Sequence, residues 1–264
     1  RETSRPESLD YFFRSGLTWP VRTQRGLNVR VMPDGHVFAH VGASIFVHNK
    51  GDEAYLLGVL NTRIAEYLAL CFAAFGSWQT GVLKRIPVPQ PPRSVKDRIG
   101  SFANEVYSAK ATWDTGNEAC TRFSMPWMIQ PRFVLNLGDG PVTSLLDRLV
   151  EYEASEEARI RIVYSDLNDE VYRIYDIPDG TRQILEEELG DRPLEFLWPQ
   201  MEGKTVDQKR MEHVWRLLSF AVKRVIETDD DGIVPFSQAT GEKPLVDRVR
   251  QEVEGAADAR RNPV

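Results

Sequence analysis

The sequence predicts an α+β fold, with a mixed, β-rich front that contains one long core helix and a mainly α-helical rear. Three observations carry this prediction. Residues 11–47 hold short β-branched and aromatic runs between glycines and prolines. Residues 54–75 form an apolar stretch of helical length, and the residues after 93 repeat apolar side chains at three- and four-residue spacing. With 264 residues, the chain has room for one large domain or two ordinary ones.

Several short strands are expected in the front. Residues 11–23 combine aromatic and β-branched side chains with turn formers, which suits a strand that enters a turn. Residues 27–32 alternate apolar and polar side chains, residues 33–35 supply turn chemistry, and residues 36–40 resume an extended pattern. This order predicts a hairpin. A further strand is expected at residues 43–47.

The apolar stretch at residues 54–75 is expected to be a buried helix that ends near Gly76. Polar residues such as Asn61 interrupt it and would be costly in lipid, which favours a core helix over a membrane span. Asp52 and Glu53 stand at its first turn, where the helix dipole favours acids.

A proline-rich segment marks the clearest boundary in the chain. Residues 76–92 are expected to form a short strand that runs into extended chain, because proline cannot donate a ladder hydrogen bond. The predicted division is therefore a front module at residues 1–92 and a mainly helical region at residues 93–264.

The rear pattern is mainly helical, with a mixed stretch at residues 125–136. The last residues, 255–264, lack apolar spacing and are expected to fray. Helices are predicted from residue 94 onward and at residues 145–157, 167–175, 182–189 and 208–226.

The charge is divided unevenly along the chain. The formal net charge is -6, yet residues 1–100 carry 13 Lys or Arg against 8 Asp or Glu, which leaves 20 against 31 for the remainder. A basic front favours contact with nucleic acid, and an acidic rear favours solvated or protein-facing surfaces.

Motifs of catalysis and cofactor binding are absent from the sequence. It contains neither GxGxxG nor GxxxxGK[ST], no HExxH and no GxSxG, so no catalytic, cofactor-binding or metal-binding residue is predicted in this chain. His36 and His40 could share a strand face, but ordinary half-buried positions are favoured over metal ligation. Cys71 and Cys120 have neither CxxC spacing nor a neighbouring histidine, which favours two reduced thiols of a cytoplasmic protein.

Two clusters in the front have the composition of a DNA-binding surface. Both combine cations with hydroxyls and amides, the groups that bind phosphates and base edges, and the second adds an aromatic ring for stacking or wedging. The first cluster contains Arg22, Thr23, Arg25 and Arg30, interleaved with Thr18, Gln24 and Asn28; the second contains Ser77, Trp78, Gln79, Thr80, Lys84 and Arg85. The residues predicted to bind DNA are Arg22, Thr23, Arg25 and Arg30 of the first cluster and Trp78, Gln79, Lys84 and Arg85 of the second. The same residue types also occur on any solvated hairpin.

An ordered series of short motifs resembles a known family. It comprises GLTWP at residues 16–20, PDG at 33–35, LLGVLNTR at 56–63, GSWQTG at 76–81 and IPVP at 86–89. Looser matches follow in the rear, among them NDEVYRIY and DGIVP. The series resembles the region after the catalytic domain in PglX-type adenine-specific DNA methyltransferases of BREX phage-defence systems and of related restriction-modification enzymes.

The resemblance implies a target-recognition region followed by a helical C-terminal region. The catalytic half of that family carries a glycine-rich S-adenosylmethionine loop and an Asn-Pro-Pro-Tyr or Phe motif, and neither occurs here. Because the chain starts at Arg1 rather than Met, we expect a fragment, with the catalytic domain and its S-adenosylmethionine upstream. The implied partners are double-stranded DNA, that upstream domain and other defence-system proteins, without a membrane.

Two other function classes remain open from the sequence. One is a protein-interaction scaffold within a multi-subunit complex, in which the arginines are solvated and the helical stripes form contacts between subunits. The other, ranked last, is a nuclease that holds a divalent ion with Asp166, Asp169 and Glu170.

Overall fold

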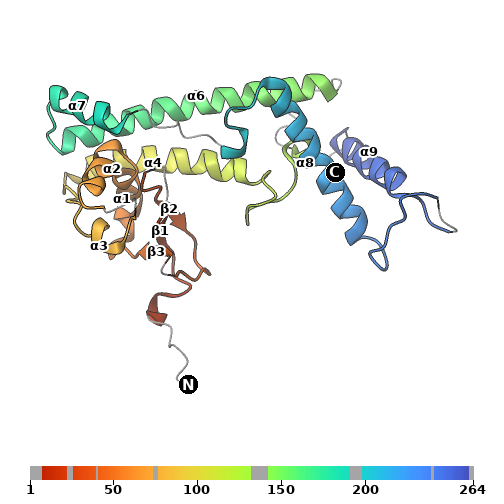
Figure 1. Ribbon diagram of the computed structural model, residues 1–264, viewed down its shortest axis with the longest axis horizontal. Helices are drawn as coiled ribbons and strands as arrows, with labels where there is room; N and C mark the ends of the chain where they lie inside the picture. Colours follow the sequence, from red (N-terminus) through yellow and green to blue (C-terminus); the bar gives the residue numbers. More distant parts are fainter. Residues whose placement is uncertain are drawn as a thin grey trace. The chain divides into compact units, whose positions relative to one another are not determined.

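The computed structural model describes residues 8–22, 26–39, 41–73, 77–131, 142–190, 198–238 and 241–261. The fold is α+β, as predicted (Figure 1). The chain forms two compact units: unit 1 comprises residues 1–107 and 160–194, and unit 2 comprises residues 108–159 and 195–264. The predicted boundary at residue 92 lies within unit 1.

Unit 1 contains a three-stranded antiparallel sheet. Its strands are β1 (Gly16–Pro20), β2 (Arg30–Met32) and β3 (Gly42–Ile45), in the order β2-β1-β3. Leu17 and Trp19 of β1 are almost completely buried, as expected for alternate residues of a strand that covers a core.

The predicted hairpin between residues 27–32 and 36–40 is wrong. Both edges of β1 are occupied, with Thr18 opposite Arg30 on one side and opposite Ser44 on the other, so β2 pairs with β1 rather than with the residues after the turn. Of the described residues 36–39, Ala39 alone makes a bridge, to Gly42. The burial of β1 explains this choice, because the most apolar strand takes the central place.

The predicted single helix at residues 54–75 is two helices, α1 (Glu53–Leu60) and α2 (Arg63–Leu70). The Asn61 side chain accepts a hydrogen bond from Val29 N at 3.0 Å and donates to Val29 O at 2.9 Å. Arg63 N donates to Asn168 Oδ1 at 2.9 Å. Asn61 Nδ2 also donates to Leu57 O at 2.9 Å, so the two asparagines satisfy backbone groups at the end of α1 and at the start of α2, where the chain turns. The predicted end at Gly76 lies outside the described residues.

The predicted strand within residues 76–92 is a short helix, α3 (Thr80–Leu83), preceded by one bridge between Ser77 and Arg22. Val82 of this helix and Ile86 after it are both buried in the core of unit 1. The following prolines lie in extended chain up to α4 (Arg93–Asp114).

Two further helical segments complete unit 1. The second half of α6 (Val142–Ile174) and α7 (Asp179–Leu189) pack on the first helices of the front. Helices expected separately at residues 145–157 and 167–175 are one helix, because Ile160 and Val163 between them are buried at helical spacing. This core cluster contains Tyr55, Val59, Ile64, Ile99, Leu167, Val171, Tyr172 and Leu185.

Unit 2 is built around stacked aromatic rings. Trp113 and Trp127 have centroids 3.4 Å apart with an angle of 15° between their planes, and Trp198 meets Trp113 edge-on at 4.9 Å. A Cβ on Gly116 would lie 1.6 Å from Trp127 Cδ1, so only glycine admits this stack.

Two helices cover these rings. α8 (Val206–Glu227) begins with a capping box of Thr205 and Gln208, and it packs against α9 (Leu245–Arg261). The expectation that residues 255–264 fray is wrong for residues up to Arg261, which continue α9. Among the described helices, none combines the length and apolar character needed to cross a membrane.

Candidate nucleic-acid interface

The two predicted DNA-binding clusters meet beside the sheet in unit 1. Arg22 forms an antiparallel bridge with Ser77, although 54 positions separate them along the chain. Trp78 N donates to Val21 O at 2.7 Å, and Trp19 Nε1 donates to Trp78 O at 2.7 Å. These contacts hold the end of β1 against the segment that leads into α3.

Polar side chains of both clusters reach the surface around this junction. Arg22 is exposed where β1 ends, Gln79 precedes α3, and Lys84 and Arg85 follow it, all exposed. Arg85 Cζ lies 5.6 Å from the centroid of the Phe72 ring, a cation–π contact that restrains the guanidinium without neutralising it. Three cations and one amide are thus presented from adjoining segments.

Arg30 lies on β2, which is an edge strand of the sheet. Its register partner on β1 is Thr18, whose own partner on β3 is Ser44, so the three side chains share the sheet face that points away from Leu17. Arg30 is exposed, and its Nε contacts Asn28 Oδ1 at 3.5 Å. Thr23 and Arg25, also predicted to bind DNA, lie outside the described residues.

Trp78 is a core residue in this structure. Its side chain is 3% exposed and packs with Trp19, Val82 and the other buried residues under the sheet. The stacking or wedge role predicted for Trp78 does not fit this placement, because a base could reach the ring only after it left the core. The sequence signal, an aromatic residue among polar neighbours, is shared by buried and exposed tryptophans.

Sequence reasoning missed an exposed aromatic segment before β1. Tyr11 and Phe13 are 43% and 62% exposed, and Arg14 lies over the Tyr11 ring at 5.3 Å from its centroid. The signal was the run of three aromatic residues and an arginine at positions 11–14, which we interpreted only as the start of a strand.

Two of the three acids considered for a nuclease site, Asp169 and Glu170, are engaged in ion pairs. Glu170 is buried and binds the guanidinium groups of Arg98 and Arg173, and Asp169 pairs with Arg182 at 2.7 Å. Within the part of the chain that the structure describes, no three His, Cys, Asp or Glu side chains gather as they would around a metal ion. His36 is exposed, and His40 is not among the described residues.

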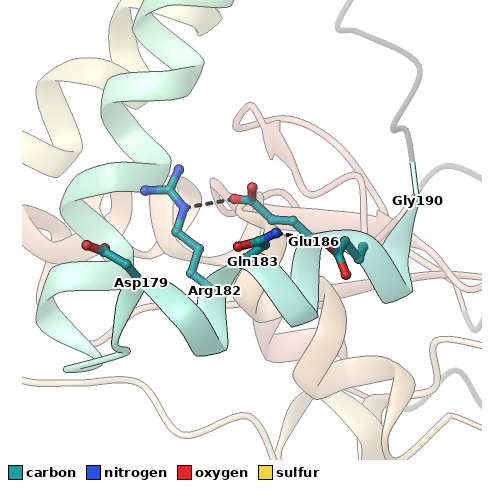
Figure 2. A pocket seen from close by; sticks show the side chains of 6 residues that line it. Asp179, Arg182, Gln183, Glu186 and Gly190 are labelled. Carbon is teal, nitrogen blue, oxygen red and sulfur yellow. Dashed lines mark hydrogen bonds and ion pairs between the residues drawn. The ribbon is translucent and has the colours of Figure 1, made fainter.

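A hollow of about 560 Å³ lies along one face of α7 (Figure 2). Its lining residues are Asp179, Arg182, Gln183, Glu186, Glu187 and Gly190. Arg182 Nε donates to Glu186 Oε1 at 2.9 Å and Gln183 Nε2 donates to Glu187 Oε1 at 2.9 Å, so these side chains bind one another along the helix. An acidic hollow on one helix repels phosphate and offers no convergent catalytic groups.

A buried polar cluster occurs in unit 2. His213 is 1% exposed and lies 4.0 Å from Glu153 Oε2, while Lys209 Nζ binds Glu153 Oε1 at 2.7 Å. Burial, with help from the charges of Arg216 and Lys209, lowers the pKa of His213 to about 3. Lys209 already compensates the Glu153 charge, so this histidine is neutral at physiological pH.

No protein-family model matches the chain. A curated relative, the adenine-specific methyltransferase BrxX of Escherichia coli O9:H4 (strain HS), is 23% identical to it over 160 residues. The chain is distantly related to an adenine-specific methyltransferase. The match covers 60% of this chain and 13% of BrxX, so the chain spans a small part of that protein's length.

The relation to BrxX agrees with the resemblance seen in the short motifs of the front. The catalytic motifs of that methyltransferase family, the glycine-rich cofactor loop and Asn-Pro-Pro-Tyr or Phe, do not occur in this sequence.

Proposed function

We propose that unit 1 contains the DNA target-recognition module of an adenine-specific methyltransferase of a phage-defence or restriction-modification system. The proposed contacts are made by Arg22, Arg30, Gln79, Lys84 and Arg85, with Thr23 and Arg25 retained from the sequence. The catalytic domain, its S-adenosylmethionine and any further defence proteins belong to the parent enzyme in this proposal.

One observation supports the proposal above the others: the Arg22–Ser77 bridge joins two segments of similar polar and basic composition. Two such segments far apart in sequence form one surface only if the fold brings them together. Arginine can bind guanine bidentately or clamp a phosphate, glutamine can bind adenine, and lysine acts as a point charge for phosphate. The side chains around the junction therefore have the chemistry for both positioning and base contacts.

The test is duplex binding of the chain as a function of salt. Arg22→Ala and the pair Lys84→Ala with Arg85→Ala should weaken binding and lower the slope of log affinity against log salt, by roughly 0.9 for each lost phosphate contact. Fluorescence anisotropy with a labelled duplex measures both quantities.

Arg250→Ala is the matched control, because Arg250 is an exposed arginine on α9 of unit 2. The affinity of the Arg250→Ala variant for the duplex, and the slope of its log affinity against log salt, should equal those of the unchanged chain. Equal effects of all the variants, or no effect of the front variants, would contradict a specific interface around Arg22 and Ser77.

A second candidate, a protein-interaction scaffold, is favoured by one feature of α8. His213, Leu217, Ala221 and Val225 form its buried stripe. A second apolar stripe, Met211, Trp215, Leu218 and Ile226, faces solvent, with Trp215 62% exposed. Exposed apolar stripes of this kind are typical of protein contacts. Weak duplex binding that is insensitive to salt, together with self-association reduced by Trp215→Ala in light scattering, would favour this candidate.

A further inference from the structure

Phe13 combines exposure with an unusual backbone conformation. Its side chain is 62% exposed, and its φ of 64° lies in the left-handed region that bulky residues rarely adopt. Neither property favours the folded state by itself. Backbone conformations of this kind persist where the surrounding structure enforces them, often at binding sites.

Hydrogen bonds on both sides enforce the conformation of Phe13. Gly35 N donates to Phe13 O at 2.9 Å, and Phe13 N donates to His36 O at 2.9 Å. Phe13 thus exchanges hydrogen bonds with two successive residues, Gly35 and His36, and Gly35 has a positive φ of 79°. This exchange lies beyond the Gly16–Met32 pair, where the β1–β2 register ends.

A cluster of four aromatic rings, Tyr11, Phe12, Phe38 and Phe46, supports the segment. The Phe12 and Phe38 rings lie edge to face with centroids 5.3 Å apart, and the Phe38 and Phe46 rings are 5.4 Å apart. Tyr11 packs on Phe46 at 4.9 Å. The Phe13 ring lies edge to face with the Phe12 ring of this cluster, and the two centroids are 6.4 Å apart. The aromatic cluster is therefore held by mutual packing, while the ring of Phe13 remains accessible to solvent.

One cation follows the Phe13 ring directly along the chain. Arg14 Cζ lies 5.3 Å from the Tyr11 centroid and 5.9 Å from that of Phe46. Lys50 Nζ donates to Ser15 O at 3.0 Å but also pairs with Glu53 at 2.9 Å, which compensates its charge. In Figure 1 the red segment before β1, which contains η1 (Leu9–Tyr11), projects from the sheet away from α1, α2 and α3. The acids Asp10 and Asp34 also occur in this region, so any attraction for phosphate comes from the Arg14 guanidinium and not from net charge.

We propose that Phe13 is a wedge that enters a base step of duplex DNA and partly unstacks it, with Arg14 on a flanking phosphate. The inference rests on the proposed function of unit 1 and adds the residue that deforms the duplex. An apolar ring held rigidly at a projecting turn loses little conformational entropy on insertion, and its burial between bases removes it from water. Insertion of such wedges kinks the duplex and widens the contact surface.

The experiment first selects a bound duplex from a randomised library with the full chain. That duplex is then made with 2-aminopurine at successive positions, because the emission of this base rises when it unstacks. The unchanged chain should raise the emission at one step. Phe13→Ala should abolish the rise and weaken binding by roughly 5- to 150-fold, the range for loss of one base–aromatic stack. The salt slope should stay the same, because no phosphate contact is lost.

Two variants separate the wedge from folding effects. Phe13→Gly removes the ring and suits the positive φ, so its melting temperature should be no lower than that of the unchanged chain, while the emission rise is lost. Leu9→Ala removes another exposed apolar side chain of the same segment, 58% exposed, and should leave the emission rise intact.

The failures are distinguishable. If the unchanged chain selects no duplex and shows no salt-dependent binding, the proposed function fails and the wedge with it. If the chain binds DNA with the expected salt slope but Phe13→Ala keeps both the affinity and the emission rise, only the wedge is overturned. A ring that serves a protein contact instead gives this second result.

Discussion

Single residues set the pH response of unit 2. His213 lies against Trp198, with ring centroids 5.8 Å apart, and its Nε2 accepts no hydrogen bond from any residue that the structure describes. Adding a proton would place a charge in a buried site that already contains Arg216 and Lys209. The folded state therefore holds His213 neutral, and the unfolded chain does not.

We predict that acid destabilises unit 2 through His213. The pKa is lowered to about 3 in the folded state from an ordinary value of 6.5, so the unfolded state binds more protons. The stability contribution is full above pH ~6.5 and declines as the pH falls toward 3, by up to ~1.4 kcal/mol per pH unit. Urea unfolding between pH 7 and pH 5 measures this slope. His213→Phe should flatten it, whereas the exposed His36→Phe should not; equal slopes in all three proteins would contradict the assignment.

At the scale of elements, the front depends on polar side chains that connect helices to strands. Asn168 of α6 accepts a hydrogen bond from Arg63 N at the start of α2 and donates to Tyr164 O at 2.8 Å. The Tyr164 hydroxyl donates to Asn61 O at 3.1 Å. The break between α1 and α2 is thus stabilised by a helix about a hundred residues later.

Asn168→Ala should destabilise unit 1 by about 1–3 kcal/mol, because it leaves the Arg63 N–H without its acceptor at a partly buried helix start. The midpoint of urea unfolding, followed by circular dichroism, measures the loss. Asn49→Ala is the control, since Asn49 is exposed and caps only the short turn at Gly51. A loss as small as that of the control would mean that water replaces Asn168.

At the scale of the whole molecule, the basic front belongs to a unit that is not basic. Residues 1–107 contain 13 Lys or Arg and 9 Asp or Glu, and residues 160–194 contain 4 and 9, so unit 1 carries 17 basic and 18 acidic residues. Any attraction to DNA therefore comes from the local arrangement around Arg22, Arg30 and Lys84. It does not come from net charge.

The predicted front module, residues 1–92, should not fold by itself. Its Tyr55, Val59 and Ile64 pack against Leu167 and other residues of α6 and α7, and each such side chain contributes about 1.5–3 kcal/mol when buried. Thermal unfolding of the fragment 1–92 should show no cooperative transition, whereas residues 1–107 joined to 160–194 should show one. A cooperative transition of the short fragment, at the temperature of the longer one, would contradict the composition of unit 1.

The sequence by itself determined the α+β class and the helices α4, α7 and α8, because apolar spacing within a few turns is a local property. The DNA-binding role of the front cations and amides, which residue type alone suggested, stays a prediction. Only the tertiary structure decided that Asn61 breaks a helix, that β1 is the central strand, that Trp78 is buried and that Phe13 is displayed. Each of these depends on a partner distant in sequence, such as Val29 for Asn61 or Ser77 for Arg22. A local pattern contains no information about such partners, because burial and strand pairing are fixed by the contacts of the whole unit.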